Sequence, residues 1–106
     1  MYRLQLSEET LNAVLKFRDD RGWNPFHNPK DLAASISIEA AELIECFQWS
    51  GASTEPTADI GHVQEEIADV LIYTLYLADR LGVDLDRAVK DKLTKNAIKY
   101  PIKDDK

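Results

Sequence analysis

The segment DIGHVQEEIADVLIYTLYLADRL, residues Asp59–Leu81, decides the fold of this chain. Its apolar side chains recur every three or four positions, which is the spacing of one face of an α-helix. Asp59 can cap the first turn, and Gly82 follows the last periodic residue. The pattern therefore predicts one long helix with an apolar stripe at Val63, Ile67, Val70, Leu77 and Leu81.

Capping and helix-ending residues of the same kinds predict three more helices. Each begins at a residue that can cap a first turn, and glycine or proline ends two of them. The expected ranges are Ser7 to Gly22, Asn28 to about Trp49, and Asp84 to Pro101. No segment alternates with the period of two that a half-buried strand requires. The sequence predicts an all-α, four-helix subunit that forms a single domain over residues 1–106.

The composition limits the classes of protein. The chain has 106 residues, 44% hydrophobic and 30% charged, which is typical of a small globular domain with a modest core. The net charge of −6 argues against nucleic acid as a partner, and no apolar run is long enough to span a membrane. Cys46 is the single cysteine, so an intrachain disulfide is excluded. With no visible targeting peptide, we expect a cytoplasmic protein.

The acidic residues gather in the middle of the chain. Between Asp31 and Asp79 there are ten Asp and Glu residues and no Lys or Arg. Eight of the thirteen basic residues follow, from Arg80 to Lys106. A solvated helix face ordinarily mixes acidic and basic side chains. Since this segment has no basic residue, its carboxylates need a counter-charge from elsewhere.

Two pairs of carboxylates occupy matching places on neighbouring helices. Glu39 and Glu42 lie roughly 60° and 120° around their helix from the apolar stripe of Leu32, Ile36, Ala40, Leu43 and Phe47. Glu66 and Asp69 take about the same angles from Val63 on the next helix. Four such carboxylates in one pocket would repel each other unless a hard cation such as Mg²⁺ bound them. A solvated acidic flank is the alternative, and it is the favoured interpretation for Glu45 and Glu65.

The last helix carries the opposite charge. Its apolar stripe, Leu85, Val89, Leu93 and Tyr100, is interrupted by Asn96, and Lys92, Lys95 and Lys99 follow one shoulder. A triphosphate held by cations on one side needs ammonium or amide donors on the other. Aromatic side chains at Trp23, Phe26, His27 and Trp49 could stack a base, although core packing is the favoured interpretation when they are taken alone.

These residues together resemble a known family, the MazG-like nucleotide pyrophosphatases, and within it the small dCTP-pyrophosphatase type. The matching segments are FRDDRGWNPFHNP from Phe17, EAAELIECFQW from Glu39, EEIADVLIY from Glu65 and KLTKNAIKYP from Lys92. The resemblance implies an α-helical subunit of a dimer or tetramer that cleaves nucleoside triphosphates to the monophosphate and pyrophosphate. It also implies a role in clearing unwanted nucleotides.

The resemblance implies a role for each matching residue. Glu39, Glu42, Glu66 and Asp69 would bind Mg²⁺ and act in catalysis. Lys92, Asn96 and Tyr100 would face the phosphates and sugar, with Lys92 stabilising the leaving pyrophosphate. Trp23, His27 and Trp49 would hold the base.

Several questions stay open at the level of the sequence. Glu42 or Glu45 could take the proton of the attacking water. A phosphoribosyl-ATP pyrophosphohydrolase and a non-catalytic acidic interaction module are the alternative functions. The loop from Ser50 to Asp59 gives no indication of base preference.

An oligomer is also expected from the long helix alone. Ile72 and Tyr76 lie opposite its predicted stripe, so the helix is apolar all round and should be covered by a second subunit.

Overall fold

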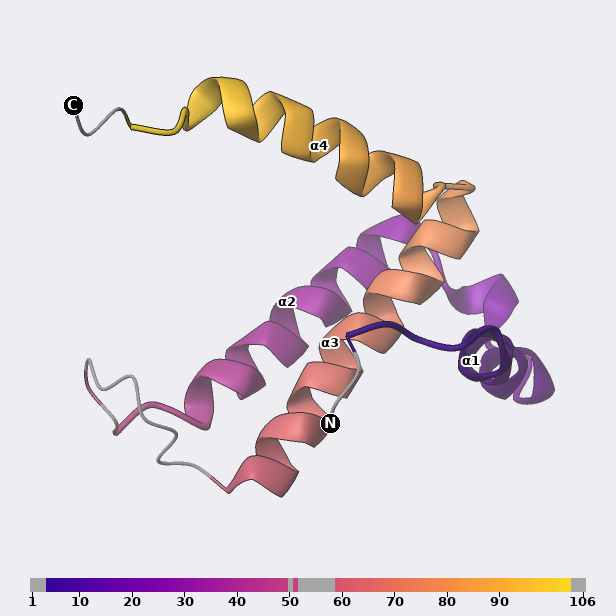
Figure 1. The fold of residues 1–106 in the computed structure, drawn as a ribbon. Coiled ribbons are helices and arrows are strands. Elements are labelled where there is room, and N and C mark those ends of the chain that lie inside the picture. The colour runs from indigo at the N-terminus through magenta and orange to yellow at the C-terminus, as the bar shows by residue number, and fades with distance from the viewer. Residues whose placement is uncertain (1–3, 50, 52–58, 104–106) are drawn as a thin grey trace.

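A computed structural model describes residues 4–49, 51 and 59–103. Over these residues the chain forms four α-helices and one short 3₁₀ helix, and none of them lies in a strand (Figure 1). The elements are α1 (Glu8–Asp20), η1 (Asn24–Phe26), α2 (Pro29–Glu45), α3 (Ile60–Leu81) and α4 (Leu85–Lys99). The predicted all-α class is confirmed. Most of the expected loop after Trp49 lies outside the described residues.

All four helices begin at the capping residues that the sequence indicated. Ser7, Asn28, Asp59 and Asp84 each accept a hydrogen bond from a backbone N–H of the first turn. The predicted end of α2 at about Trp49 was wrong, because the helix stops at Glu45. The backbone N–H groups of the next residues bond three positions back, as from Phe47 to Ile44, which tightens the chain out of the α-helix.

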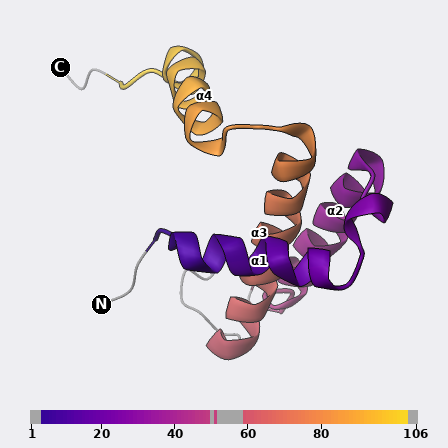
Figure 2. The same ribbon diagram turned by 90° about the vertical axis from the view of Figure 1, so that its right-hand side faces the viewer.

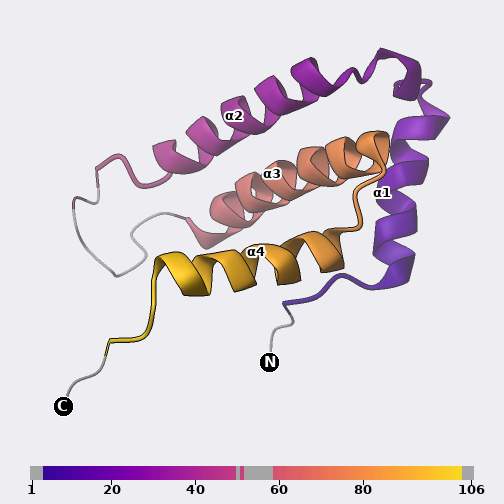
Figure 3. The same cartoon turned by 90° about the horizontal axis from the view of Figure 1, so that it is seen from above.

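Helices α2 and α3 form an antiparallel pair that holds the core (Figures 1 and 3). Leu32, near the start of α2, is 2% exposed, and Val63, near the start of α3, is also buried, so each end of the antiparallel pair buries one residue of a predicted stripe. Ile67, Leu81 and Phe47 were predicted in the stripes, yet all three are exposed in the single chain. The reason is that two helices cover only one face of each other, and a narrow seam leaves the flanks of both stripes open.

Helix α1 crosses the pair and covers α3 (Figure 2). Tyr76 is only 3% exposed, and its hydroxyl donates to the carbonyl of Val14 on α1 over 3.0 Å. The expectation that a second subunit must cover Tyr76 was wrong, because α1 of the same chain does so. The face of α3 opposite its predicted stripe is therefore covered at Tyr76 by α1 of the same subunit.

Helix α4 stands apart from the other helices (Figures 1 and 2). It has no buried residue, and Leu85, Val89, Leu93 and Tyr100, which were predicted to face the core, are exposed. The chain's radius of gyration is 16.9 Å, whereas a compact domain of this length has about 13 Å. The prediction failed within one chain because Gly82 and Asp84 turn the backbone so that α4 points away from the pair. None of the described helices is both long and apolar enough to cross a membrane.

Candidate functional site

Three carboxylates meet where α2 lies against α3. Glu39 and Glu42 are one turn apart on α2, and Glu66 comes from α3. One oxygen atom of each residue lies within 4.8 Å of one from both others. Glu66 is buried, although it is charged in its ordinary state. The predicted convergence of the two helices' acids is thus present in the structure for these three residues, which we call the acid cluster.

Two members of the acid cluster, Glu39 and Glu66, are hard to ionise. Burial raises the pKa of Glu39 to about 7, helped by a hydrogen bond with Glu42 and by the charges of Glu42, Asp69 and Glu66. The pKa of Glu66 is also raised, first by burial and then by the charge of Glu42. The imidazole of His62 lies beside the acid cluster, with Nε2 3.9 Å from Oε1 of Glu66, and it carries a charge only when it is protonated. Among the described residues no Lys or Arg forms an ion pair with these three carboxylates.

The acid cluster fits a bound divalent cation. Oε2 of Glu39 and Oε2 of Glu66 are both buried and have no hydrogen-bond partner among the described residues. Buried carboxylate oxygens without a donor are costly, and an oxygen-seeking cation removes that cost for both at once. Hard cations such as Mg²⁺ prefer oxygen ligands of this kind.

The raised pKa of Glu39 predicts how the metal-free protein responds to pH. Between the ordinary value of 4.5 and about 7 the folded state keeps a proton that the unfolded state has lost, so stability falls as the pH rises through this window. We expect the Glu39→Gln variant to lose less stability than the wild type over the same range. Thermal melting of both proteins with a chelator, from about pH 5 to about pH 8, measures this difference.

The comparison with Glu39→Gln is needed because the titration of His27 changes the stability of the folded state with pH in the opposite direction. Its pKa is lowered in the folded state, so its contribution to stability grows as the pH rises. The difference between the two proteins cancels the effect of His27. Identical melting curves at every pH would contradict the assignment of the raised pKa to Glu39.

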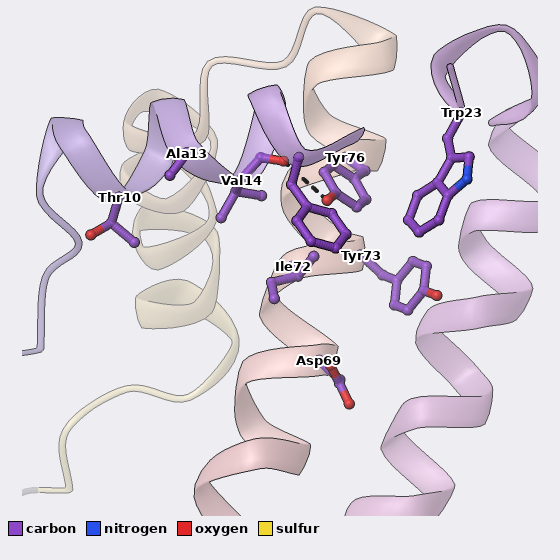
Figure 4. Close-up of a pocket in the computed structure, with 9 residues that line it drawn as sticks. Thr10, Ala13, Val14, Trp23, Asp69, Ile72, Tyr73 and Tyr76 are labelled. Atoms are coloured by element: carbon purple, nitrogen blue, oxygen red, sulfur yellow. Dashed lines mark hydrogen bonds between the residues drawn. The ribbon is translucent and has the colours of Figure 1, made fainter. Parts of the chain in front are cut away.

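Asp69 lies between the acid cluster and a pocket. It raises the pKa of Glu39 through its charge, yet its carboxylate is not among the three that converge. Asp69 also lines a cavity of about 410 Å³ between α1 and α3. Figure 4 shows Asp69 about one turn of α3 from Ile72 and Tyr73, with Trp23 farther from it, beside Tyr73 and Tyr76. The residues that line the pocket are mostly apolar or aromatic, and Asp69 is the one charged residue among them.

The predicted base-binding residues do not all come together. Trp23 lines the pocket, and the ring of His27 lies 6.2 Å from that of Trp23 and 5.3 Å from that of Tyr76. Trp49 is 90% exposed and follows the opposite end of α2. Because a helix of this length spans about 25 Å, Trp49 does not reach the pocket of its own chain.

The predicted phosphate-binding residues lie on α4, away from the acid cluster. Lys92 and Tyr100 are exposed, and Asn96 is half-buried. Of the residues that the structure describes on α4, none packs into the core. Within a single chain the structure therefore separates Lys92, Asn96 and Tyr100 from the carboxylates that they were expected to complement.

Sequence reasoning missed two residues beside the site. Tyr73 lines the pocket four positions after Asp69, a spacing that puts both on one face of α3 and could have revealed it. His62 precedes Glu66 by the same spacing, and its Nε2 lies 3.9 Å from Oε1 of Glu66 in the acid cluster. Both signals are weak in sequence, because a single i,i+4 pair occurs on many helices.

Comparisons with known proteins agree on one relationship. The model of the MazG-like family matches residues 34–106. The chain is 42% identical to dCTP pyrophosphatase 1 of Rattus norvegicus over 100 residues, and 37% identical to the dATP/dGTP diphosphohydrolase of Cyanophage S-2L over 73 residues. These alignments cover 90% and 69% of the chain but only 59% and 58% of the two relatives. The chain thus spans about three-fifths of the length of these curated relatives.

A solved structure matches over nearly the full length. The crystal structure of a pyrophosphatase from Archaeoglobus fulgidus superposes with a TM-score of 0.82 at 47% sequence identity. The match covers 96% of this chain and 100% of that one.

Proposed function

Because this chain belongs to the MazG-like family, we propose that it hydrolyses nucleoside triphosphates to the monophosphate and pyrophosphate, with Mg²⁺ as cofactor. The observation that carries the proposal is the acid cluster, whose buried oxygens on Glu39 and Glu66 lack a donor among the described residues. The pocket beside it, lined by Asp69 and Trp23, is wide enough for a planar base. dCTP-like substrates are favoured, since a relative so named shares 42% of its aligned residues.

In the proposed site Glu39, Glu42, Glu66 and Asp69 hold the cation. When bound, the cation supplies charge neutralisation for the phosphates and activates water for attack on the α-phosphorus. Glu42 is favoured over Glu45 as the acceptor of the water's proton, because Glu42 belongs to the acid cluster and Glu45 is exposed outside it. The aromatic rings of Trp23 and Tyr73 hold the base at the pocket and exclude water from it.

Lys92 would stabilise the charge on the leaving pyrophosphate, together with Asn96 and Tyr100. Since α4 stands apart from the acid cluster of its own chain, these groups serve the cluster of a second subunit. The exposed Trp49 would likewise contact a base bound by another subunit. The working enzyme is then a homo-oligomer, a dimer or tetramer, in which each site draws on two chains.

One assay tests the proposed function. Pyrophosphate release is measured from a panel of ribo- and deoxyribonucleoside triphosphates and from phosphoribosyl-ATP, each with Mg²⁺ and with a chelator. We expect release from triphosphates only with Mg²⁺, with dCTP among the best substrates. Release from phosphoribosyl-ATP alone would favour a phosphoribosyl-ATP pyrophosphohydrolase. No release from any nucleotide would favour a non-catalytic acidic interaction module.

The open face of α4 predicts the oligomer. Leu93 is 61% exposed in the single chain, and Val89 beside it is exposed as well. An apolar stripe of this length on an unpartnered helix is unusual for a monomer. Light scattering at micromolar concentration should give a multiple of the chain mass of 12.0 kDa.

A substitution on α4 checks that this stripe is the contact. Leu93→Asp should reduce the mass to that of one chain, because a buried unpaired carboxylate is costly. Thr94→Asp adds the same charge about 100° further around the helix and should leave the oligomer intact. A wild-type protein of 12.0 kDa would contradict the shared site.

A further inference from the structure

Arg18 is a buried charge that the proposed reaction does not use. Its side chain on α1 is only 5% exposed, and its Nη1 donates to Oδ2 of Asp79 on α3 over 2.8 Å. Its Nε donates to Oδ1 of Asp19 over 2.9 Å. A guanidinium this deeply buried is tolerated only when such partners are present. The pair with Asp79 joins α1 to α3 across 61 positions of sequence.

The guanidinium of Arg18 and the imidazole of His27 both lie against the ring of Tyr76. The Cζ of Arg18 lies 5.6 Å from the centre of the Tyr76 ring, and the imidazole of His27 lies 5.3 Å from the same centre. The hydroxyl of Tyr76 is fixed by its bond to the carbonyl of Val14. The ring of Trp23, which lines the pocket, lies 6.2 Å from the imidazole, measured between ring centres. Arg18, held by its bond to Asp79, thus lies over the ring against which His27 packs.

The surroundings of His27 oppose a positive charge on it. Burial lowers its pKa, and the charge of Arg18 lowers it further. Its Nδ1 is buried and has no hydrogen-bond partner among the described residues. A charged imidazole carries a proton on both nitrogens, so it would leave a buried N–H without an acceptor. Contacts tie two groups to these surroundings, namely the guanidinium of Arg18 and the phenol of Tyr76. Arg18 is paired in turn with Asp19 on α1 and with Asp79 on α3. On α2, which follows His27 in the chain, Lys30 and Asp31 are both exposed.

We propose that Arg18 is a positioning residue, which holds His27 as an uncharged imidazole with its proton on Nε2. In this form Nε2 donates to an acceptor atom, such as the carbonyl oxygen or ring nitrogen that a nucleobase presents. The contact of His27 with a base rests on the proposed function. The link between Arg18 and the state of His27 rests only on the contacts within the free chain.

Nitrogen-15 NMR of the free, metal-free protein tests this link without any substrate. The wild type should show the neutral tautomer with Nε2 protonated at about pH 7, the range in which histidine states are resolved. A proton on Nδ1, or a charged ring at that pH, would overturn the proposal.

Variants of Arg18 and of Arg21, the residue that follows α1, show whether the charge of Arg18 lowers the pKa of His27. Arg18→Met should raise the pKa of His27, whereas Arg18→Lys, which keeps the charge, should leave it low. Arg21→Met is the matched control, because Arg21 is exposed and lies over Phe17. Equal shifts in Arg18→Met and Arg21→Met, or none in either, would refute the role of Arg18.

Kinetics then separate positioning from catalysis. At about pH 6 Arg18→Met should raise KM by roughly three- to tenfold, the loss of about one hydrogen bond, because the charged ring turns to satisfy Nδ1. At about pH 8 KM should return towards the wild type, and kcat should change little at either pH. A loss in kcat independent of pH would assign Arg18 a purely structural role. If no nucleotide is hydrolysed, the proposed function fails and the NMR result still decides the link.

Discussion

Glu39→Gln and Asp69→Asn are each expected to lower turnover by at least about a hundredfold while the helical circular dichroism signal persists. Both changes keep the shape of the side chain but remove the negative charge that a cation requires. Oε2 of Glu39 is buried without a donor among the described residues, so its role in the free protein is not to hold the fold together. Steady-state pyrophosphate release and circular dichroism measure the two effects separately.

The same variants should be more stable than the wild type when metal is absent. Burial and the neighbouring charges of Glu42, Asp69 and Glu66 already raise the pKa of Glu39, which shows that its charge is unfavourable in the folded state. Glu65→Gln is the matched control, since Glu65 is exposed next to the buried Glu66. Near wild-type turnover in Glu39→Gln, or an equal loss in Glu65→Gln, would show that the acid cluster is not the metal site.

Lys92→Ala is expected to lower turnover by roughly ten- to a thousandfold, the range for losing a charged contact to the transition state. Lys90→Ala removes an exposed lysine of the same helix, one that pairs with Asp86 at 3.0 Å, and should have little effect. Unchanged catalytic efficiency in Lys92→Ala would show that Lys92 is a solvated surface residue with no role in the reaction.

Mixing two inactive variants tests whether the site spans two subunits. In a mixed dimer of Glu39→Gln and Lys92→Ala chains, one site carries both defects and the other carries neither. Random exchange should therefore restore about a quarter of the sites, because half of the dimers are mixed and one of their two sites is intact. If activity does not return although mixed oligomers form, each chain supplies both residues to its own site.

The secondary structure was predictable because its signals are local. Caps at Ser7, Asn28, Asp59 and Asp84 lie within a few residues of the backbone groups that they bind. Gly82 adopts a φ of 66°, which glycine reaches without strain, and it ends α3 where the sequence indicated. The end of α2 was missed because no glycine or proline marks it, and three-residue turns there compete closely with the helix.

The acid pairs were predictable because helical geometry fixes the face of each residue. The spacing within Glu39 and Glu42, and the matching place of Glu66, required no knowledge of the fold. The position of Asp69 at the edge of a pocket was not visible, since it depends on how α1 crosses α3. Arg18 was likewise not singled out, because its partner Asp79 is distant in the sequence.

By itself the sequence determined the helices, their caps and the faces that carry the carboxylates, since each of these depends on residues within a few turns. Only the tertiary structure decided that α1 buries Tyr76, that Arg18 lies beside the ring against which His27 packs, and that α4 leaves its apolar stripe open. The physical reason is that an apolar stripe indicates that a face will be covered but not what covers it. For Tyr76 the cover is a helix of the same chain, and for Leu93 it is absent from the single subunit.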